Sequence, residues 1–117
     1  MAKNIKFEDG SQLSVVCTHP ATPASGDPVR VGDRCGVALT AERADGTTTV
    51  KFDGVATLSV KAVNAGGNSA VAVGDTLYYV DADTPVLSKK VAGVRFGYAL
   101  AAVTSGATAS IDVAVGY

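Results

Sequence analysis

Tryptophan is absent from this sequence, and only three phenylalanines and four tyrosines supply aromatic mass. The chain is nevertheless apolar enough to fold, because 47% of its 117 residues are hydrophobic and only 18% are charged. Most of this apolar mass is valine and alanine. Small and β-branched side chains suit a thin pleated layer better than a thick helical bundle. The length indicates one domain.

Clustered positive charge is also missing. Ten basic and eleven acidic residues give a net charge of −1, and the longest basic run is the pair Lys89 and Lys90. Proteins that bind nucleic acid need clustered Lys and Arg to neutralise phosphates, so we expect no nucleic-acid partner. No apolar run is long enough to span a bilayer, and the N-terminal residues lack the apolar core of a signal peptide. We therefore expect no membrane partner. We expect the protein either to stay in the cytoplasm in which it is made or to be assembled there into something larger.

Residues that carry chemistry are scarce too. His19 is the only histidine and has no evident orienting partner. Cys17, His19, Cys35 and Asp33 lack the paired short spacings of a zinc site, and no glycine precedes a lysine, which excludes a phosphate-binding P-loop. We therefore expect that the chain is not an enzyme and that it binds no metal, no cofactor and no small-molecule substrate. Cys17 and Cys35 are expected to be reduced, buried thiols, with a disulfide as the alternative.

Glycine and proline, in contrast, occur throughout. The longest stretch free of both is residues 55–65, which leaves room for a helical turn or two at most, near residues 61–65. Between these breaks, apolar and polar residues alternate as in half-buried strands at 13–17, 48–52, 56–60 and 111–115. Residues 93–103 are apolar on both faces, which predicts a central strand whose glycines mark a bulge or a close backbone approach. The pattern predicts an all-β fold, either a small β-barrel or a β-sandwich.

Two parts of the sequence are similar to each other. Each contains Gly-Asp-x-aliphatic followed by Gly-x-Ala-Leu: Gly26-Asp27-Pro28-Val29 with Gly36-Val37-Ala38-Leu39, and Gly74-Asp75-Thr76-Leu77 with Gly97-Tyr98-Ala99-Leu100. The spacing between the two motifs is ten residues in one part and twenty-three in the other, so this is not a solenoid period. The similarity predicts either two related hairpins in one barrel or a coincidence.

Several segments resemble a family of small tailed-phage proteins that decorate capsids. These are Met1-Ala2-Lys3-Asn4, Ser25-Gly26-Asp27-Pro28-Val29, Gly36-Val37-Ala38, Phe52-Asp53-Gly54-Val55, Val73-Gly74-Asp75-Thr76-Leu77-Tyr78-Tyr79, Gly97-Tyr98-Ala99-Leu100 and Ser110-Ile111-Asp112-Val113. Such proteins are encoded near the major capsid gene and are similar to lambda-type head decoration proteins. Some are described as recombinase-like, a function that the missing P-loop and basic stripe exclude here.

The resemblance implies a structural capsid decoration, or cement, protein on the outer surface of a phage head. Its partner would be the major capsid protein, and it would form a homotrimer at threefold or quasi-threefold positions and stabilise the mature shell. A phage tail or baseplate interaction module is the alternative. The resemblance also implies a role for the family-motif turns, whose residues are Gly26, Asp27, Gly74, Asp75 and Gly97.

Residues 1–10 are predicted to form an extended N-terminal arm preceding a single β domain at 11–117. Ile5 and Phe7 would share one face of this arm, with Asn4 and Lys6 on the other. The arm is either an edge strand of the protein's own sheet or a strand added to a capsid sheet edge. In the second case the capsid-contact residues are Ala2, Lys3, Asn4, Ile5, Lys6 and Phe7.

Overall fold

The computed structural model describes residues 12–116, which form eleven strands and no helix, so this part of the chain has no helix able to cross a membrane. The predicted all-β fold is confirmed. The strands are β1 (Gln12–Val15), β2 (Pro28–Val31), β3 (Arg34–Ala38), β4 (Thr48–Lys51), β5 (Gly54–Lys61), β6 (Val63–Asn64), β7 (Gly67–Asn68), β8 (Thr76–Tyr79), β9 (Leu87–Ser88), β10 (Val94–Ala99) and β11 (Thr108–Val115). The helical turn expected near 61–65 is wrong, because β5 continues to Lys61 and the next residues pair as β6 and β7.

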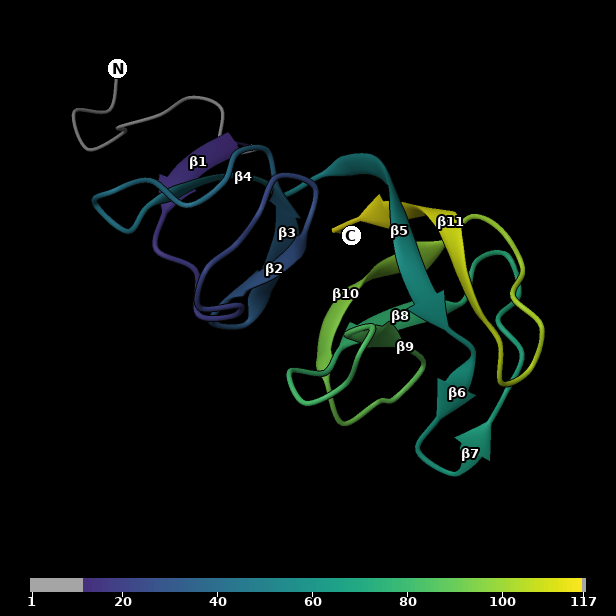
Figure 1. Ribbon diagram of the computed structural model, residues 1–117. Helices are drawn as coiled ribbons and strands as arrows, with labels where there is room; N and C mark the ends of the chain where they lie inside the picture. Colours follow the sequence, from purple (N-terminus) through teal and green to yellow (C-terminus); the bar gives the residue numbers. More distant parts are fainter. Residues whose placement is uncertain (1–11, 117) are drawn as a thin grey trace, which may run out of the picture.

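These strands form two β units that lie side by side (Figure 1). The first unit is a four-stranded antiparallel sheet in the order β1-β4-β3-β2. The second is a closed barrel in the order β10-β11-β5-β9-β8, where β5 and β9 form the one parallel pair among residues 12–116. The short β6–β7 ribbon extends from the barrel. The sequence is thus divided near residue 53, where the first sheet ends and the barrel begins.

Four strands appear where period-two alternation predicts them, as β1, β4, β5 and β11. In β5, Leu58 and Val60 are buried while Ser59 and Lys61 are exposed, so one face of the strand lines the barrel core. Alternation predicts such strands well because a shift by one residue would turn every apolar side chain outward.

The central strand predicted at 93–103 is shorter than expected. It pairs with both β8 and β11 as β10 but ends at Ala99, and Leu100 is exposed. Arg95 is also exposed, so the two faces are not equally covered. The predicted irregularity is confirmed, since the register with β8 shifts between Arg95 and Gly97 as in a β-bulge.

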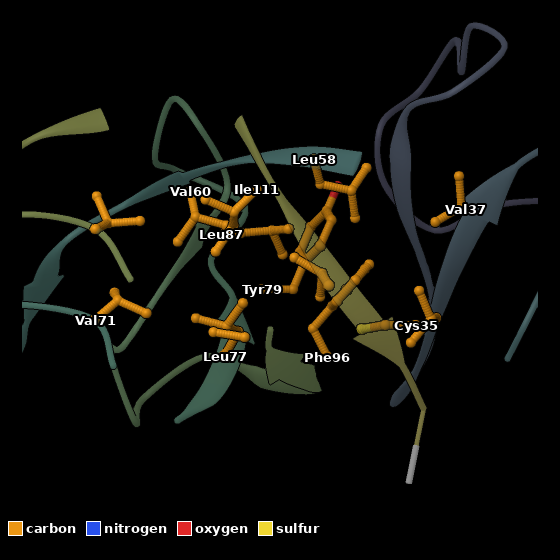
Figure 2. Packing of buried hydrophobic residues seen from close by; sticks show 14 of the residues in the cluster. Cys35, Val37, Leu58, Val60, Val71, Leu77, Tyr79, Leu87, Phe96 and Ile111 are labelled. Atoms are coloured by element: carbon orange, nitrogen blue, oxygen red, sulfur yellow. The ribbon is translucent and has the colours of Figure 1, made fainter. Parts of the chain in front are cut away.

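Two buried clusters correspond to the two units. The larger fills the barrel around Tyr79, Phe96, Leu77 and Leu87, with the Tyr79 and Phe96 rings stacked at a centroid distance of 6.4 Å (Figure 2). The smaller lies on the first sheet and consists of Val29, Ala38, Val50 and Phe52.

Strand β3 joins the two units. Its Cys35 and Val37 belong to the barrel cluster although the strand itself is part of the first sheet. Figure 2 shows Cys35 beside Phe96, where β3 contacts β10. The predicted arm at 1–10 lies outside the described residues, and the division into an arm and one domain stays a prediction.

Candidate functional site: two equivalent Gly-Asp turns

The first family-motif turn is closed by its own aspartate. The Asp27 carboxylate accepts a hydrogen bond from the Ala24 backbone N–H at 3.0 Å, and the Asp27 N–H donates to the Ala24 carbonyl at 3.1 Å. Gly26, between them, has a φ of 89°, a conformation that favours glycine. The residue types Gly-Asp are therefore explained locally by the turn they form.

The second family-motif turn has the same geometry. The Asp75 carboxylate accepts from the Ala72 N–H at 2.8 Å, and the Asp75 N–H donates to the Ala72 carbonyl at 3.1 Å. Gly74 has a φ of 90°. Because Asp75 also forms an ion pair with Lys89 at 3.2 Å, the hydrogen bond from Ala72 and this cation together lower the pKa of its carboxyl.

Both turns join the following Gly-x-Ala-Leu segment through identical hydrogen bonds. They are Gly26 N–H to Ala38 C=O at 2.8 Å, Ala38 N–H to Asp27 C=O at 2.9 Å, Gly74 N–H to Ala99 C=O at 2.7 Å, and Ala99 N–H to Asp75 C=O at 2.9 Å. The register agrees as well, because Val29 faces Gly36 just as Leu77 faces Gly97.

The similarity extends over four strands in each unit. The order β1-β4-β3-β2 in the sheet matches β5-β11-β10-β8 in the barrel. The chain therefore contains one four-stranded arrangement twice. The prediction of two related hairpins in one barrel is half right. The two strand pairs, β2 with β3 and β8 with β10, are equivalent, but they lie in different sheets. A stronger signal was available in the sequence, since Arg34-Cys35-Gly36-Val37-Ala38-Leu39 and Arg95-Phe96-Gly97-Tyr98-Ala99-Leu100 share four of six residues.

Gly36 and Gly97 are equivalent residues in the two units, and both leave space for a neighbouring backbone. A Cβ on Gly36 would lie 2.6 Å from the Lys51 carbonyl oxygen, and a Cβ on Gly97 would overlap the Ala114 carbonyl oxygen. Lys51 pairs with Val37 as Ala114 pairs with Tyr98, so these contacts are also equivalent. The close backbone approach predicted for the 93–103 strand is confirmed at Gly97.

The units differ in how they close. In the barrel, residues 80–93 contain β9, which pairs with both β5 and β8. In the first unit only a short turn at Gly32 and Asp33 connects the equivalent strands. The edge of β2 is covered instead by the chain after β1, where Thr18 N–H donates to the Arg30 carbonyl at 2.7 Å and Arg30 N–H donates to the His19 carbonyl at 2.8 Å.

A polar cluster joins the two units. The Arg30 guanidinium donates two hydrogen bonds to the Asp81 carboxylate, at 3.0 and 2.7 Å, and these lower the pKa of the Asp81 carboxyl. The His19 Nδ1 atom lies 2.6 Å from the Tyr79 hydroxyl oxygen. Burial of the Tyr79 ring raises the pKa of that hydroxyl. Each contact connects a residue of the first unit to one of the barrel, so the cluster acts as a polar link between them.

This arrangement gives His19 a structural partner in the Tyr79 hydroxyl. Within residues 12–116, no three His, Cys, Asp or Glu side chains lie together in a way that could hold a metal ion. Cys17 and Cys35 are free thiols, half-buried and buried respectively. Burial raises the pKa of Cys35 to about 12, so its thiol stays protonated at neutral pH.

Substituting Asp81→Asn is expected to lower the free energy of unfolding at pH 7 by about 0.5–1 kcal/mol, because the Asp81 side chain is 42% exposed and solvent screens the pair. The folded-state pKa of Asp81 is lowered, so its contribution to the free energy of unfolding is present above the unfolded pKa of about 4 and is lost as pH falls through the folded pKa. Denaturant unfolding from pH 7 to pH 2 should show the two proteins converging in acid. Asp53→Asn, which removes a more exposed pair with Lys51, is the control expected to change little. Equal stability of wild type and Asp81→Asn at pH 7 would contradict the link.

The capsid-contact residues predicted in the arm, 2–7, fall outside the described residues. The turn residues Gly26, Asp27, Gly74 and Asp75 are brought into two equivalent positions, one in each unit.

Comparison with known proteins matches the chain to a known family. A family model described as "Phage cement protein" matches residues 7–116. No curated protein and no solved structure matches the chain.

Proposed function

The chain belongs to the phage cement protein family, and on that basis we propose that it binds the outer surface of a phage head through the major capsid protein. The observation that carries this proposal is a family match that includes both β units and nearly the whole chain. Cement proteins are structural components of the virion. Purified protein added to heads that lack it should therefore bind them saturably.

The proposed assembly is a homotrimer at threefold or quasi-threefold positions of the shell. Such an oligomer would let each chain touch more than one capsid subunit, so modest contacts combine through effective concentration. Binding the mature lattice better than separated subunits would stabilise the occupied shell. A map of the decorated particle tests the placement. Single copies, or dimers at twofold positions, would be incompatible with it.

The arm at 1–10 is proposed to add a strand to a capsid sheet edge, where main-chain hydrogen bonds give affinity and the Ile5 and Phe7 side chains set the register. Deleting residues 2–7 is expected to weaken head binding at least about tenfold while the melting temperature stays nearly unchanged. Binding is measured by co-sedimentation with heads and melting by circular dichroism. Lys3→Ala, which keeps both apolar residues, serves as the control expected to retain most binding. If the truncated protein melts much lower, the arm is instead an edge strand of the protein's own fold.

A further inference from the structure

Leu39 and Leu100 occupy equivalent positions, and both are exposed. The side chain of Leu39 is 40% exposed and that of Leu100 is 43% exposed, and each directly follows the Ala that is bonded to a Gly-Asp turn. The equivalence includes the next strand, since the Leu39 N–H donates to the Thr49 backbone carbonyl at 2.8 Å and the Leu100 N–H donates to the Asp112 backbone carbonyl at 2.9 Å. A single exposed leucine needs no explanation, but the same one presented twice in one chain indicates a repeated surface.

We define the first tip as residues 24–27 with Leu39, and the second tip as residues 72–75 with Leu100. Each tip holds one carboxylate, Asp27 or Asp75, which accepts a hydrogen bond from the backbone of its own turn, and Asp75 is also paired with Lys89. The neighbouring residues of the second tip are apolar, with Val73 67% exposed. The exposed Leu39, Leu100 and Val73 side chains therefore suit a partner surface with an apolar patch.

The two units also meet through equivalent strands. Strand β3 of the first unit contacts β10 of the barrel, and these strands carry the matching Gly-x-Ala-Leu segments. The groove between them is lined by the equivalent pairs Arg34 with Arg95, Cys35 with Phe96, and Asp53 with Gly116. In a twofold dimer, the same surface of each subunit contacts its copy on the other subunit, and the contact between β3 and β10 is of this kind. The chain is thus arranged as a covalently linked pair of similar units, each with its own tip.

We propose that the two tips bind equivalent sites on two neighbouring copies of the capsid subunit, an inference that rests on the proposed capsid function. A shell is built from many copies of one subunit and so offers the same site repeatedly at fixed spacing. Two similar surfaces on one chain match two similar sites. Because the second contact forms at high effective concentration, a chain with both tips intact binds far more tightly than a chain with one.

The test compares single and double substitutions at the tips. Leu39→Asp and Leu100→Asp each place a charge in a contact that should be apolar, and each is expected to raise the protein concentration for half-saturation of heads at least tenfold. The double variant should show no saturable binding. Val91→Asp is the matched control, because Val91 is 69% exposed but lies in the loop between β9 and β10, outside both tips. It should bind within about twofold of wild type. Co-sedimentation with heads that lack the protein measures binding, and thermal melting verifies that every variant is folded.

The outcomes separate this inference from the function on which it rests. If wild-type protein does not bind heads, the capsid function is wrong and the inference fails with it. If wild-type protein binds and either single tip variant binds equally well, the two-tip contact is wrong while the capsid function stands. Loss of self-association in the variants, with head binding retained, would assign the tips to contacts between copies of this chain and would also overturn the proposal.

Discussion

Replacing Phe96 with alanine is expected to lower the free energy of unfolding by about 3–5 kcal/mol, because a fully buried aromatic side chain is lost and a cavity is left. The composition of the core makes the loss of this ring especially destabilising. The barrel cluster has few aromatic residues, and Phe96 stacks on Tyr79 and contacts the part of the cluster contributed by β3. Small domains have only about 5–15 kcal/mol of stability in total, so this one change should remove a large share.

Urea unfolding followed by circular dichroism measures the effect of Phe96→Ala. Val91→Ala removes an apolar side chain that is already in water, and its free energy of unfolding should stay within about 0.5 kcal/mol of wild type. A Phe96→Ala protein that unfolds at the wild-type urea concentration would show that the barrel cluster is not the main source of stability.

Gly97→Ala is expected to cost about 3 kcal/mol, at the upper end for an overpacked site. The added Cβ would overlap the Ala114 carbonyl oxygen, and a backbone atom cannot move aside as a flexible side chain can. The overlap could be removed only if β10 and β11 moved apart, and this would break the pairing of Tyr98 with Ala114 and of Ala99 with Val113.

The control for Gly97→Ala is Gly66→Ala, where the new Cβ would meet only the Asn64 side-chain oxygen at 3.4 Å. That substitution should change the free energy of unfolding by less than about 0.5 kcal/mol. Equal stability of the Gly97→Ala and Gly66→Ala proteins in the same urea titration would mean that the strands do not approach as closely as described.

Sequence patterning predicted the strands that have one clear apolar face. Period-two alternation located β4 and β11 because a strand covered on one side must place apolar residues at every second position. The same method missed β9, which has only two residues and too short a pattern. It also extended β10 beyond Ala99, because Leu100 and Val103 continue the apolar run although the chain turns there to pair with Val71 and Asp112.

The division into two units could not be predicted from local patterns. It depends on which strands pair over long distances, such as β5 with β11, and alternation says nothing about partners. The polar link could not be predicted for the same reason. His19 and Tyr79 are separated by 60 residues, and no local sequence pattern indicates that they are in contact. The repeated Gly-Asp and Gly-x-Ala-Leu segments were visible, and they proved to mark the same arrangement in both units.

Binding to undecorated heads tests the proposed function most directly. Purified protein is added over a range of concentrations to heads that lack it, and the bound fraction is measured by co-sedimentation. The capsid cement function predicts saturable binding with a fixed number of copies per head. Absence of binding to heads, with binding to isolated tails or baseplates instead, would contradict it.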